Sequence, residues 1–227
     1  MIVDVIIPAY NEELSIGLVV KDILAQNVRH VIVVSNRSTD DTEEVARTNG
    51  AIVLRENRRG YGSACLKGME WVRSLTEKPD VILFMDGDYS DYAEEFPSLM
   101  QPIESGKAEM VIGSRALGER ERGSMTPQQV FGNWLATTLI RLLFKAEFTD
   151  LGPYRTITWS ALESIGMRDP DYGWTVEMQV KAVKKGISFT EIPVNYRKRI
   201  GKSKVAGTVK GTILAGYKII TTIFKYS

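Results

Sequence analysis

The feature that most constrains the fold is an alternation, through the first half of the chain, of short apolar runs with segments of helical period. The apolar runs, each of strand length, are Val3–Ile7, His30–Val34, Ala51–Leu54, Val81–Met85 and Met110–Ile112. Helical spacing follows in the segments Glu13–Gln26, Thr42–Thr48 and Gly62–Leu75. This order predicts an α/β fold with a mostly parallel central sheet and helices on both faces. Ligands of such sheets bind beyond the carboxyl ends of the strands, where we therefore look for a site.

The second half of the chain is less regular. Gln128–Lys145 has the spacing of a long amphipathic helix, and Ser188–Val194 reads as a strand. A basic run, Tyr196–Lys204, follows that strand. No internal repeat or low-complexity linker divides the 227 residues, so we expect a single domain over residues 1–227.

Composition excludes several classes of protein. The formal net charge is +1, whereas nucleic-acid binding usually shows as a basic excess, so no nucleic-acid partner is expected. The single cysteine, Cys65, excludes an internal disulfide and a cysteine metal cluster. No run of about 20 uncharged apolar residues occurs, so the sequence predicts no transmembrane helix.

Aspartates follow the fourth apolar run directly, in the stretch VILFMDGDYSD. Asp86 and Asp88 are separated by one residue, and two such carboxylates can reach a common divalent cation. Gly87 between them lets a ligand approach closely. A cation there would neutralise a diphosphate. The alternative is a solvated acidic turn before the next helix, but the position at the end of a buried strand favours a site.

The first apolar run ends in IIPAYNEE. Pro8 forces a turn after the strand, and Tyr10 offers a flat face to a nucleobase. Asn11 and Glu12 offer hydrogen bonds to a base or a ribose. Taken alone, the stretch is better explained as a strand-to-helix turn in which Asn11 caps the helix.

Taken together, these stretches resemble a known family. VIIPAYNEE, VIVVSNRSTDDTEEVA and VILFMDGDYSD match, in order and spacing, the family 2 glycosyltransferases with their nucleotide-diphospho-sugar domain of GT-A type. Farther on, SFTEIPVNYRKRIGKSKVAG is similar to the tail of polyprenyl- and dolichyl-phosphate mannosyl- and glucosyltransferases. The resemblance covers nearly the whole chain. It implies an inverting transfer of a hexose from a nucleotide-diphosphate sugar to a polyprenyl phosphate.

The resemblance also implies roles for particular residues. Those expected to bind the nucleotide sugar are Pro8, Ala9, Tyr10, Glu12, Asn36, Asp86, Gly87, Arg199 and Lys202. Asp88, with Asp86 beside it, would hold Mg²⁺ or Mn²⁺ on the diphosphate. The donor would bind the half up to about residue 115, and the acceptor would bind the half from about residue 116.

The stretch after the second strand departs from the family pattern. The family usually has an acidic residue there that reads a base N–H, whereas this chain has Ser35, Asn36 and Arg37. Asn36 could still read a base edge through its amide, but which base stays open.

The acceptor decides whether the reaction needs a base. A hydroxyl acceptor requires one, and Glu177 is the candidate by position. A phosphate acceptor is already an anion and needs cations instead, for which Arg115 and Arg155 are the candidates. The alternative for both arginines is an ion pair with a carboxylate such as Asp150 or Glu177. Binding is favoured for Arg115, and the two interpretations are equal for Arg155.

The C-terminal stretch has the pattern of an amphipathic helix. Lys210, Lys218 and Lys225 form a basic stripe among isoleucines and aromatic residues. Such a helix can lie in a membrane interface, which suits a cytoplasmic enzyme held peripherally on the inner face of the membrane. The pattern suits equally well a helix that packs on the domain or on a second copy of the chain.

Two further alternatives for the function stay open, a soluble or glycan hydroxyl acceptor and a non-catalytic module that binds nucleotide sugars.

Overall fold

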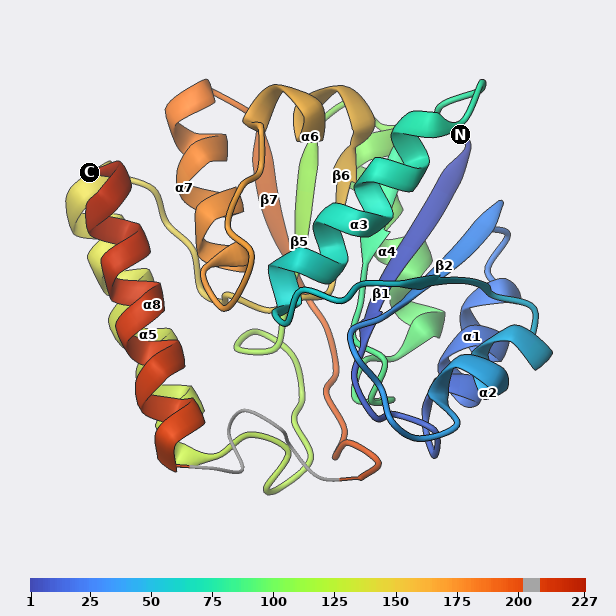
Figure 1. Ribbon diagram of the computed structural model, residues 1–227. Coiled ribbons are helices and arrows are strands. Elements are labelled where there is room, and N and C mark those ends of the chain that lie inside the picture. Colours follow the sequence, from blue (N-terminus) through green and yellow to red (C-terminus); the bar gives the residue numbers. More distant parts are fainter. Residues whose placement is uncertain (202–208) are drawn as a thin grey trace.

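The computed structural model describes residues 1–201 and 209–227, and in the second stretch it places side chains from residue 214 onward. Lys202 therefore lies outside the described residues. Within these ranges seven strands form one sheet, in the order β3-β2-β1-β4-β6-β5-β7 (Figure 1). The strands are β1 (Val3–Ala9), β2 (His30–Ser35), β3 (Ile52–Arg55), β4 (Val81–Phe84), β5 (Met110–Ser114), β6 (Arg155–Thr158) and β7 (Phe189–Pro193).

The sheet is parallel except at β6. β1 pairs in parallel with β2 and β4, β2 pairs in parallel with β3, and β5 pairs in parallel with β7. β6 lies between β4 and β5 and is antiparallel to both. The sequence did not predict β6, because its four residues, RTIT, contain no apolar run. The predicted mostly parallel sheet is confirmed, with this one exception.

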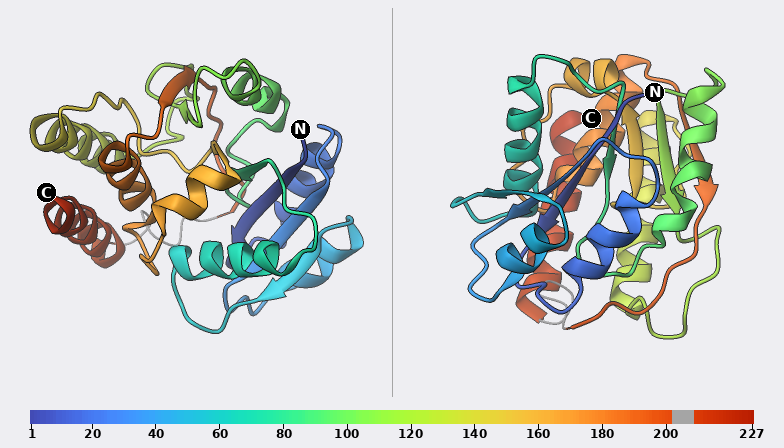
Figure 2. Two further views of the ribbon diagram at one scale, coloured as in Figure 1. Left: turned by 90° about the horizontal axis from the view of Figure 1, so that it is seen from above. Right: turned by 90° about the vertical axis from the view of Figure 1, so that its right-hand side faces the viewer.

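Helices cover both faces of the sheet, as the side view in Figure 2 shows. The helices are α1 (Ile16–Leu24), α2 (Thr42–Thr48), α3 (Tyr61–Ser74), α4 (Phe96–Glu104), α5 (Pro127–Phe144), α6 (Trp159–Ile165), α7 (Trp174–Lys185) and α8 (Val209–Tyr226). Side chains alternate between the faces along each strand. In β1, Val5 and Ile7 pack with α1, α2 and α4, whereas Ile6 packs with α3, α6 and α7.

Helices α5 and α8 lie side by side at one edge of the molecule, beyond α7 (Figure 1). The expected helix at α5 is present, and a capping box between Thr126 and Gln129 closes its N-terminus. Ala136 and Ile140 pack in the core, but the side expected to be buried faces outward, since Phe131, Trp134 and Leu142 are 60%, 58% and 69% exposed. No helix in the described part of the chain is long and apolar enough to cross a membrane.

A buried ion pair fixes the end of the sheet opposite to the carboxyl ends of the strands. Asp4 in β1 is fully buried, and its carboxylate accepts hydrogen bonds from the Arg29 guanidinium at 2.9 and 2.6 Å. The ring of His30 lies 3.1 Å from the same carboxylate. The network ends at the surface, where Glu77 is exposed and its Oε2 lies 3.5 Å from Arg29 Nη1.

We expect Asp4→Asn to lower the free energy of unfolding by about 1–3 kcal/mol, because it leaves the Arg29 guanidinium without its buried counter-charge. Urea denaturation measures the change. The matched control is Glu77→Gln, which removes the exposed end of the same network and should change stability by less than about 0.5 kcal/mol. Equal effects of the two substitutions would contradict this assignment.

Candidate active site

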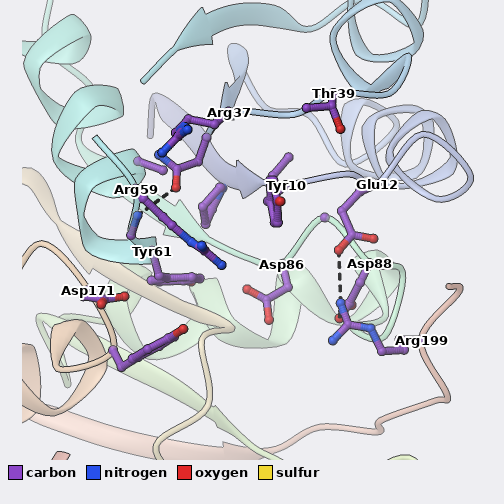
Figure 3. Close-up of a pocket in the computed structure, with 17 residues that line it drawn as sticks. Tyr10, Glu12, Arg37, Thr39, Arg59, Tyr61, Asp86, Asp88, Asp171 and Arg199 are labelled. Carbon is purple, nitrogen blue, oxygen red and sulfur yellow. Dashed lines mark hydrogen bonds and ion pairs between the residues drawn. The ribbon is translucent and has the colours of Figure 1, made fainter. Parts of the chain in front are cut away.

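A cavity of about 430 Å³ opens where the carboxyl ends of β1, β2 and β4 meet. The residues at or after the ends of these three strands that line it are Pro8, Ala9, Tyr10, Glu12, Asn36, Arg37, Thr39, Asp86, Gly87 and Asp88 (Figure 3). Arg199, which follows β7, closes one end. The structure thus brings together the described residues that the sequence pointed to for nucleotide-sugar binding.

The cavity has a second wall that sequence reasoning missed. It is formed by Arg59, Gly60, Tyr61, Ala64, Asp171 and Tyr172. The sequence feature that could have indicated this wall is the glycine pair in RRGYGSAC. A Cβ on Gly60 would lie 2.2 Å from the Pro170 carbonyl oxygen. A Cβ on Gly62 would lie 2.0 Å from the Asp169 carbonyl oxygen. The first turn of α3 therefore packs directly on the backbone of residues 169–171.

Arg199 bridges two carboxylates from different strand ends. Its Nη2 lies 2.9 Å from Asp88 Oδ2 and 3.1 Å from Glu12 Oε1, as Figure 3 shows for the labelled side chains. The backbone beside it is held as well, since the Ile200 N–H donates to the Asp88 carbonyl at 2.9 Å. The guanidinium is therefore placed on the acidic end of the cavity by main-chain and side-chain contacts together.

The neighbouring Arg197 fixes this segment on the loop after β4. Its guanidinium lies 3.5 Å from the centroid of the Tyr89 ring and 4.3 Å from that of Tyr92. Its Nε donates to the Tyr89 carbonyl at 2.6 Å, and its backbone N–H donates to the Ser90 carbonyl at 3.1 Å. The basic run thus has two functions, because Arg197 anchors the segment and Arg199 reaches the carboxylates.

The aspartates after β4 crowd negative charge into a small volume. Burial, and then the charge of Asp88, raise the pKa of Asp86 to about 7. Burial, and then the charge of Asp86, also raise the pKa of Asp91 well above its usual range. Asp88 Oδ1 accepts hydrogen bonds from the backbone N–H and the hydroxyl of Ser90. Such a cluster is stabilised by a cation that faces it.

The opposite end of the cavity contains an aromatic face. The Tyr10 ring is 36% exposed, and the Arg59 guanidinium lies 5.9 Å from its centroid.

Asn36 is placed differently from the expectation that its amide reads a base edge. Its Nδ2 donates to the carbonyls of Glu56 and Arg58, and its Oδ1 accepts from the Gly60 N–H at 2.8 Å. That expectation is corrected, because the Asn36 amide builds the cavity wall.

Arg115, which was expected to bind the acceptor, does not line the cavity and is engaged with a carboxylate instead. Its guanidinium makes a bidentate contact with Asp150, in which Nε donates to Oδ2 at 2.8 Å and Nη2 donates to Oδ1 at 2.7 Å. Both side chains are buried. Burial opposes ionisation of Asp150, but Arg115 outweighs it and lowers the pKa of that carboxyl. The ion pair that stood as the alternative is what the structure shows.

Arg155 is also withdrawn from the cavity, being 1% exposed. It donates to the carbonyl oxygens of Leu151, Gly152 and Thr175. Burial lowers its pKa to about 10. Arg155 therefore matches neither interpretation from the sequence, acceptor binding or an ion pair with a carboxylate. Its hydrogen bonds connect the loop that leads into β6 to the start of α7.

Glu177 is not placed to act as a general base. It is fully buried on α7, and its Oε2 accepts from the backbone N–H groups of Arg168 and Asp169 at 3.0 and 2.6 Å. Its Oε1 accepts from the Tyr226 hydroxyl and from Lys181 Nζ, each at 2.7 Å. Burial would raise the pKa of Glu177, but these hydrogen bonds lower it. We therefore assign Glu177 to the support of the loop before α7.

Comparison with known proteins decides the family. Residues 4–166 match the model of glycosyl transferase family 2. The chain belongs to glycosyltransferase family 2. The fold of this glycosyltransferase is accordingly the GT-A fold, which combines a mostly parallel sheet with helices on both faces.

Similar proteins include a hexosyltransferase and an undecaprenyl-phosphate mannosyltransferase. The chain is 32% identical over 207 residues to the low-salt glycan biosynthesis hexosyltransferase Agl6 of Haloferax volcanii, covering 88% of this chain but only 49% of that one. It is 28% identical over 220 residues to the undecaprenyl-phosphate mannosyltransferase of Micrococcus luteus, covering 91% and 88% of the two chains. This chain therefore spans about half the length of the first relative and most of the second.

A solved structure shares the fold. Glucosyl-3-phosphoglycerate synthase from Mycobacterium tuberculosis, in complex with Mn²⁺, uridine-diphosphate and phosphoglyceric acid, superimposes with a TM-score of 0.79. The match is 20% identical in sequence and covers 99% of this chain and 78% of that one.

The raised pKa of Asp86 predicts a pH dependence of stability. A carboxyl whose pKa is raised by folding stabilises the folded state at low pH, and this contribution is lost as the pH rises through about 7. With a chelator present, we expect the Tm of Asp86→Asn to rise relative to the Tm of the wild type between pH 5 and pH 8. Each kcal/mol of stability that the wild type loses over this range should correspond to about 2–4 °C in Tm. Thermal unfolding at several pH values measures the difference. The exposed Glu104→Gln on α4 serves as the control, and a difference between Asp86→Asn and wild type that stays constant with pH would contradict the assignment.

Proposed function

We propose that this chain is an inverting hexosyltransferase that moves a hexose from a nucleotide-diphosphate sugar to a polyprenyl phosphate. The observation that carries the proposal is the arrangement of two openings. A polar cavity with carboxylates and a cation lies at the carboxyl ends of the strands, and a separate apolar hollow lies on α5. Such a pair suits a donor with a diphosphate and an acceptor with a long apolar chain.

The donor proposal assigns the two ends of the cavity. The base stacks on Tyr10, next to Arg59, because aromatic rings and guanidinium planes are the usual partners of a base face. The diphosphate lies at the other end, near Asp88 and Arg199. A cavity of about 430 Å³ is within the range of small-molecule sites.

The residues present suit a divalent cation that arrives with the diphosphate. Among the described residues, no group of three or more histidine, cysteine or acidic side chains gathers as a complete metal site. Mg²⁺ and similar ions are commonly bound by one or two carboxylates together with substrate phosphates. Asp88, with Asp86 beside it, supplies such a partial set. When bound, Mg²⁺ or Mn²⁺ would offset the charge on the departing nucleotide diphosphate.

The acceptor proposal rests on a groove along α5. A hollow of about 280 Å³ is lined by Ala116, Arg120, Met125, Val130, Asn133, Trp134, Thr137, Thr149 and Asp150. An adjoining hollow of about 480 Å³ is lined by Met125, Pro127, Val130, Phe131 and Trp134. A polyprenyl chain suits these exposed apolar side chains, and the exposed Arg120 offers a charge to its phosphate.

Tyr196 connects this groove to the carboxylates. Its ring lies 5.0 Å from the Arg115 guanidinium, and its backbone pairs with Asp91 on one side and Arg120 on the other. The Arg115–Asp150 pair therefore forms part of the partition between the donor cavity and the groove. In this proposal Arg115 positions the partition and does not contact the acceptor.

A phosphate acceptor also fits the absence of Glu177 from the cavity. The acceptor phosphate oxygen is an anion, so it forms its bond to the anomeric carbon without transferring a proton to a base. The bond from that carbon to the nucleotide diphosphate oxygen breaks on the opposite side, and the configuration inverts. Arg199 faces the diphosphate as its charge develops. The hydroxyl-acceptor alternative loses the base that was suggested for it.

The outward face of α5 and α8 suits attachment to a membrane surface. Besides the α5 residues, Leu214, Tyr217 and Phe224 of α8 are exposed. An apolar face of this kind can rest in the interface of a bilayer, which suits a peripheral enzyme on the cytoplasmic face. A second copy of the chain is the other occupant that would cover it.

The test of the proposal is transfer of label into lipid. Purified protein is incubated with radiolabelled UDP- and GDP-hexoses, short-chain polyprenyl phosphate and Mg²⁺ or Mn²⁺. We expect one donor to yield label that extracts into organic solvent, and EDTA to abolish it. Asp88→Asn should lower the rate by about 10²-fold or more, whereas the exposed Asp41→Asn should retain it.

Label that stays in water as a new glycoside would instead support a soluble or glycan hydroxyl acceptor. Donor binding without turnover on any acceptor would support a non-catalytic module. Full activity of Asp88→Asn would remove Asp88 from the site.

A further inference from the structure

We propose that helix α8 positions one wall of the donor cavity, with Tyr226 and Lys218 as the positioning residues. The inference rests on the proposed function in that the cavity is taken to bind the donor. It goes further by assigning a role in donor binding to side chains that do not line the cavity.

The wall is the segment of residues 168–173, between α6 and α7. The side chains of Asp171 and Tyr172 line the cavity, and Asp171 lies on the side of Tyr61 and Arg59 in Figure 3. The back of the segment holds the start of α3, because the Pro170 carbonyl accepts from the backbone N–H of Ser63 at 2.8 Å. A shift of this segment would therefore move both parts of the wall.

Two buried carboxylates hold the segment in place. Glu177 accepts from the backbone N–H groups of Arg168 and Asp169, as described above. Asp169, which is 8% exposed, accepts from the backbone N–H of Asp171 at 2.8 Å through its Oδ1. The position of Asp171 in the cavity thus depends on the positions of these two carboxylates.

Helix α8 supplies a partner to each carboxylate. The Tyr226 hydroxyl donates to Glu177 Oε1 at 2.7 Å, and Lys218 Nζ lies 3.0 Å from Asp169 Oδ2. Thr222 lies between them on the same face of the helix, four residues from each. A Cβ on Gly173 would lie 2.5 Å from both Thr222 Oγ1 and Asp169 Oδ2, so helix and segment pack without spare room.

Other groups face the same carboxylates, and they define the controls. Lys181 Nζ also contacts Glu177 Oε1 at 2.7 Å and lies 5.2 Å from the Tyr226 ring centroid. Glu177 therefore keeps a counter-charge when the Tyr226 hydroxyl is removed, so Tyr226→Phe loosens the contact without stranding a buried charge. Thr221 and Lys225 lie on the same helix but contact neither carboxylate among the described interactions.

The test compares the double variant Tyr226→Phe/Lys218→Met with the control Thr221→Ala/Lys225→Met. The dissociation constants of UDP and GDP are measured by calorimetry with Mn²⁺. Hydrogen exchange of the backbone amides of Arg168, Asp169, Asp171 and Tyr172 is measured without nucleotide, so that this arm does not depend on the proposed function.

We expect the double variant to bind the preferred nucleotide about 5- to 30-fold more weakly, from the loss of one hydrogen bond and one ion pair. The same amides should exchange faster, and the donor KM should rise with little change in kcat. The control should match the wild type, and Lys218→Arg should restore most of the affinity. Unchanged exchange of these amides in the double variant overturns the inference. Faster exchange with unchanged nucleotide affinity overturns the role in donor binding, and a wild type that binds neither nucleotide overturns the proposed function instead.

Discussion

The contact of Arg199 with Glu12 and Asp88 is the interaction on which the site depends. It joins three segments that are far apart in sequence, namely the turn after β1, the loop after β4 and the run after β7. The carboxylates after β4 repel one another in a buried place. Burial and the charge of Asp88 raise the pKa of Asp86 to about 7, although the charge of Arg199 lowers it. A guanidinium balances that charge and can also face a diphosphate, because its planar fork suits phosphate oxygens as well as carboxylates.

The topology of the sheet explains how the run after β7 reaches the donor side. β7 lies at one edge of the sheet, beside β5, and the segment after it returns past the ends of the strands to pair with the loop after β4 (Figure 1). Tyr196 marks that crossing, between Asp91 and Arg120. The same crossing separates the polar cavity from the apolar groove on α5. Donor and acceptor sides are therefore defined by one segment, and Arg197 anchors it by lying against two tyrosine rings.

Much of this could be predicted from the sequence, and the exceptions have physical causes. Elements such as β1, β4 and α5 follow from apolar spacing, and the ends of β1 and β4 locate Tyr10, Glu12 and Asp88. β6 could not be predicted, because a four-residue strand held by neighbours on both sides needs no apolar run of its own. Apolar spacing in α5 did not indicate which side is buried, because the helix has apolar residues both on its buried side (Ile140) and on its exposed side (Phe131 and Trp134).

The roles of single charged residues were harder to predict than their positions near a strand end. Arg115 pairs with Asp150, which is 35 residues away in the sequence, and Glu177 contacts Tyr226 at the C-terminal end of α8. Such long-range partners leave no local pattern. Asn36 shows the same difficulty, since a side-chain amide after a strand can serve a ligand or the backbone, and only the fold of residues 56–60 decides between them.

The central claim is that Asp88 and Arg199 form the place where a metal-bound nucleoside diphosphate binds. Equilibrium dialysis of radiolabelled UDP and GDP, with Mn²⁺ or with EDTA, tests it most directly. The account predicts that Mn²⁺ raises the affinity of wild type for the preferred nucleotide by about tenfold or more, and that Asp88→Asn loses this gain. An equal gain from Mn²⁺ in wild type and Asp88→Asn would contradict it.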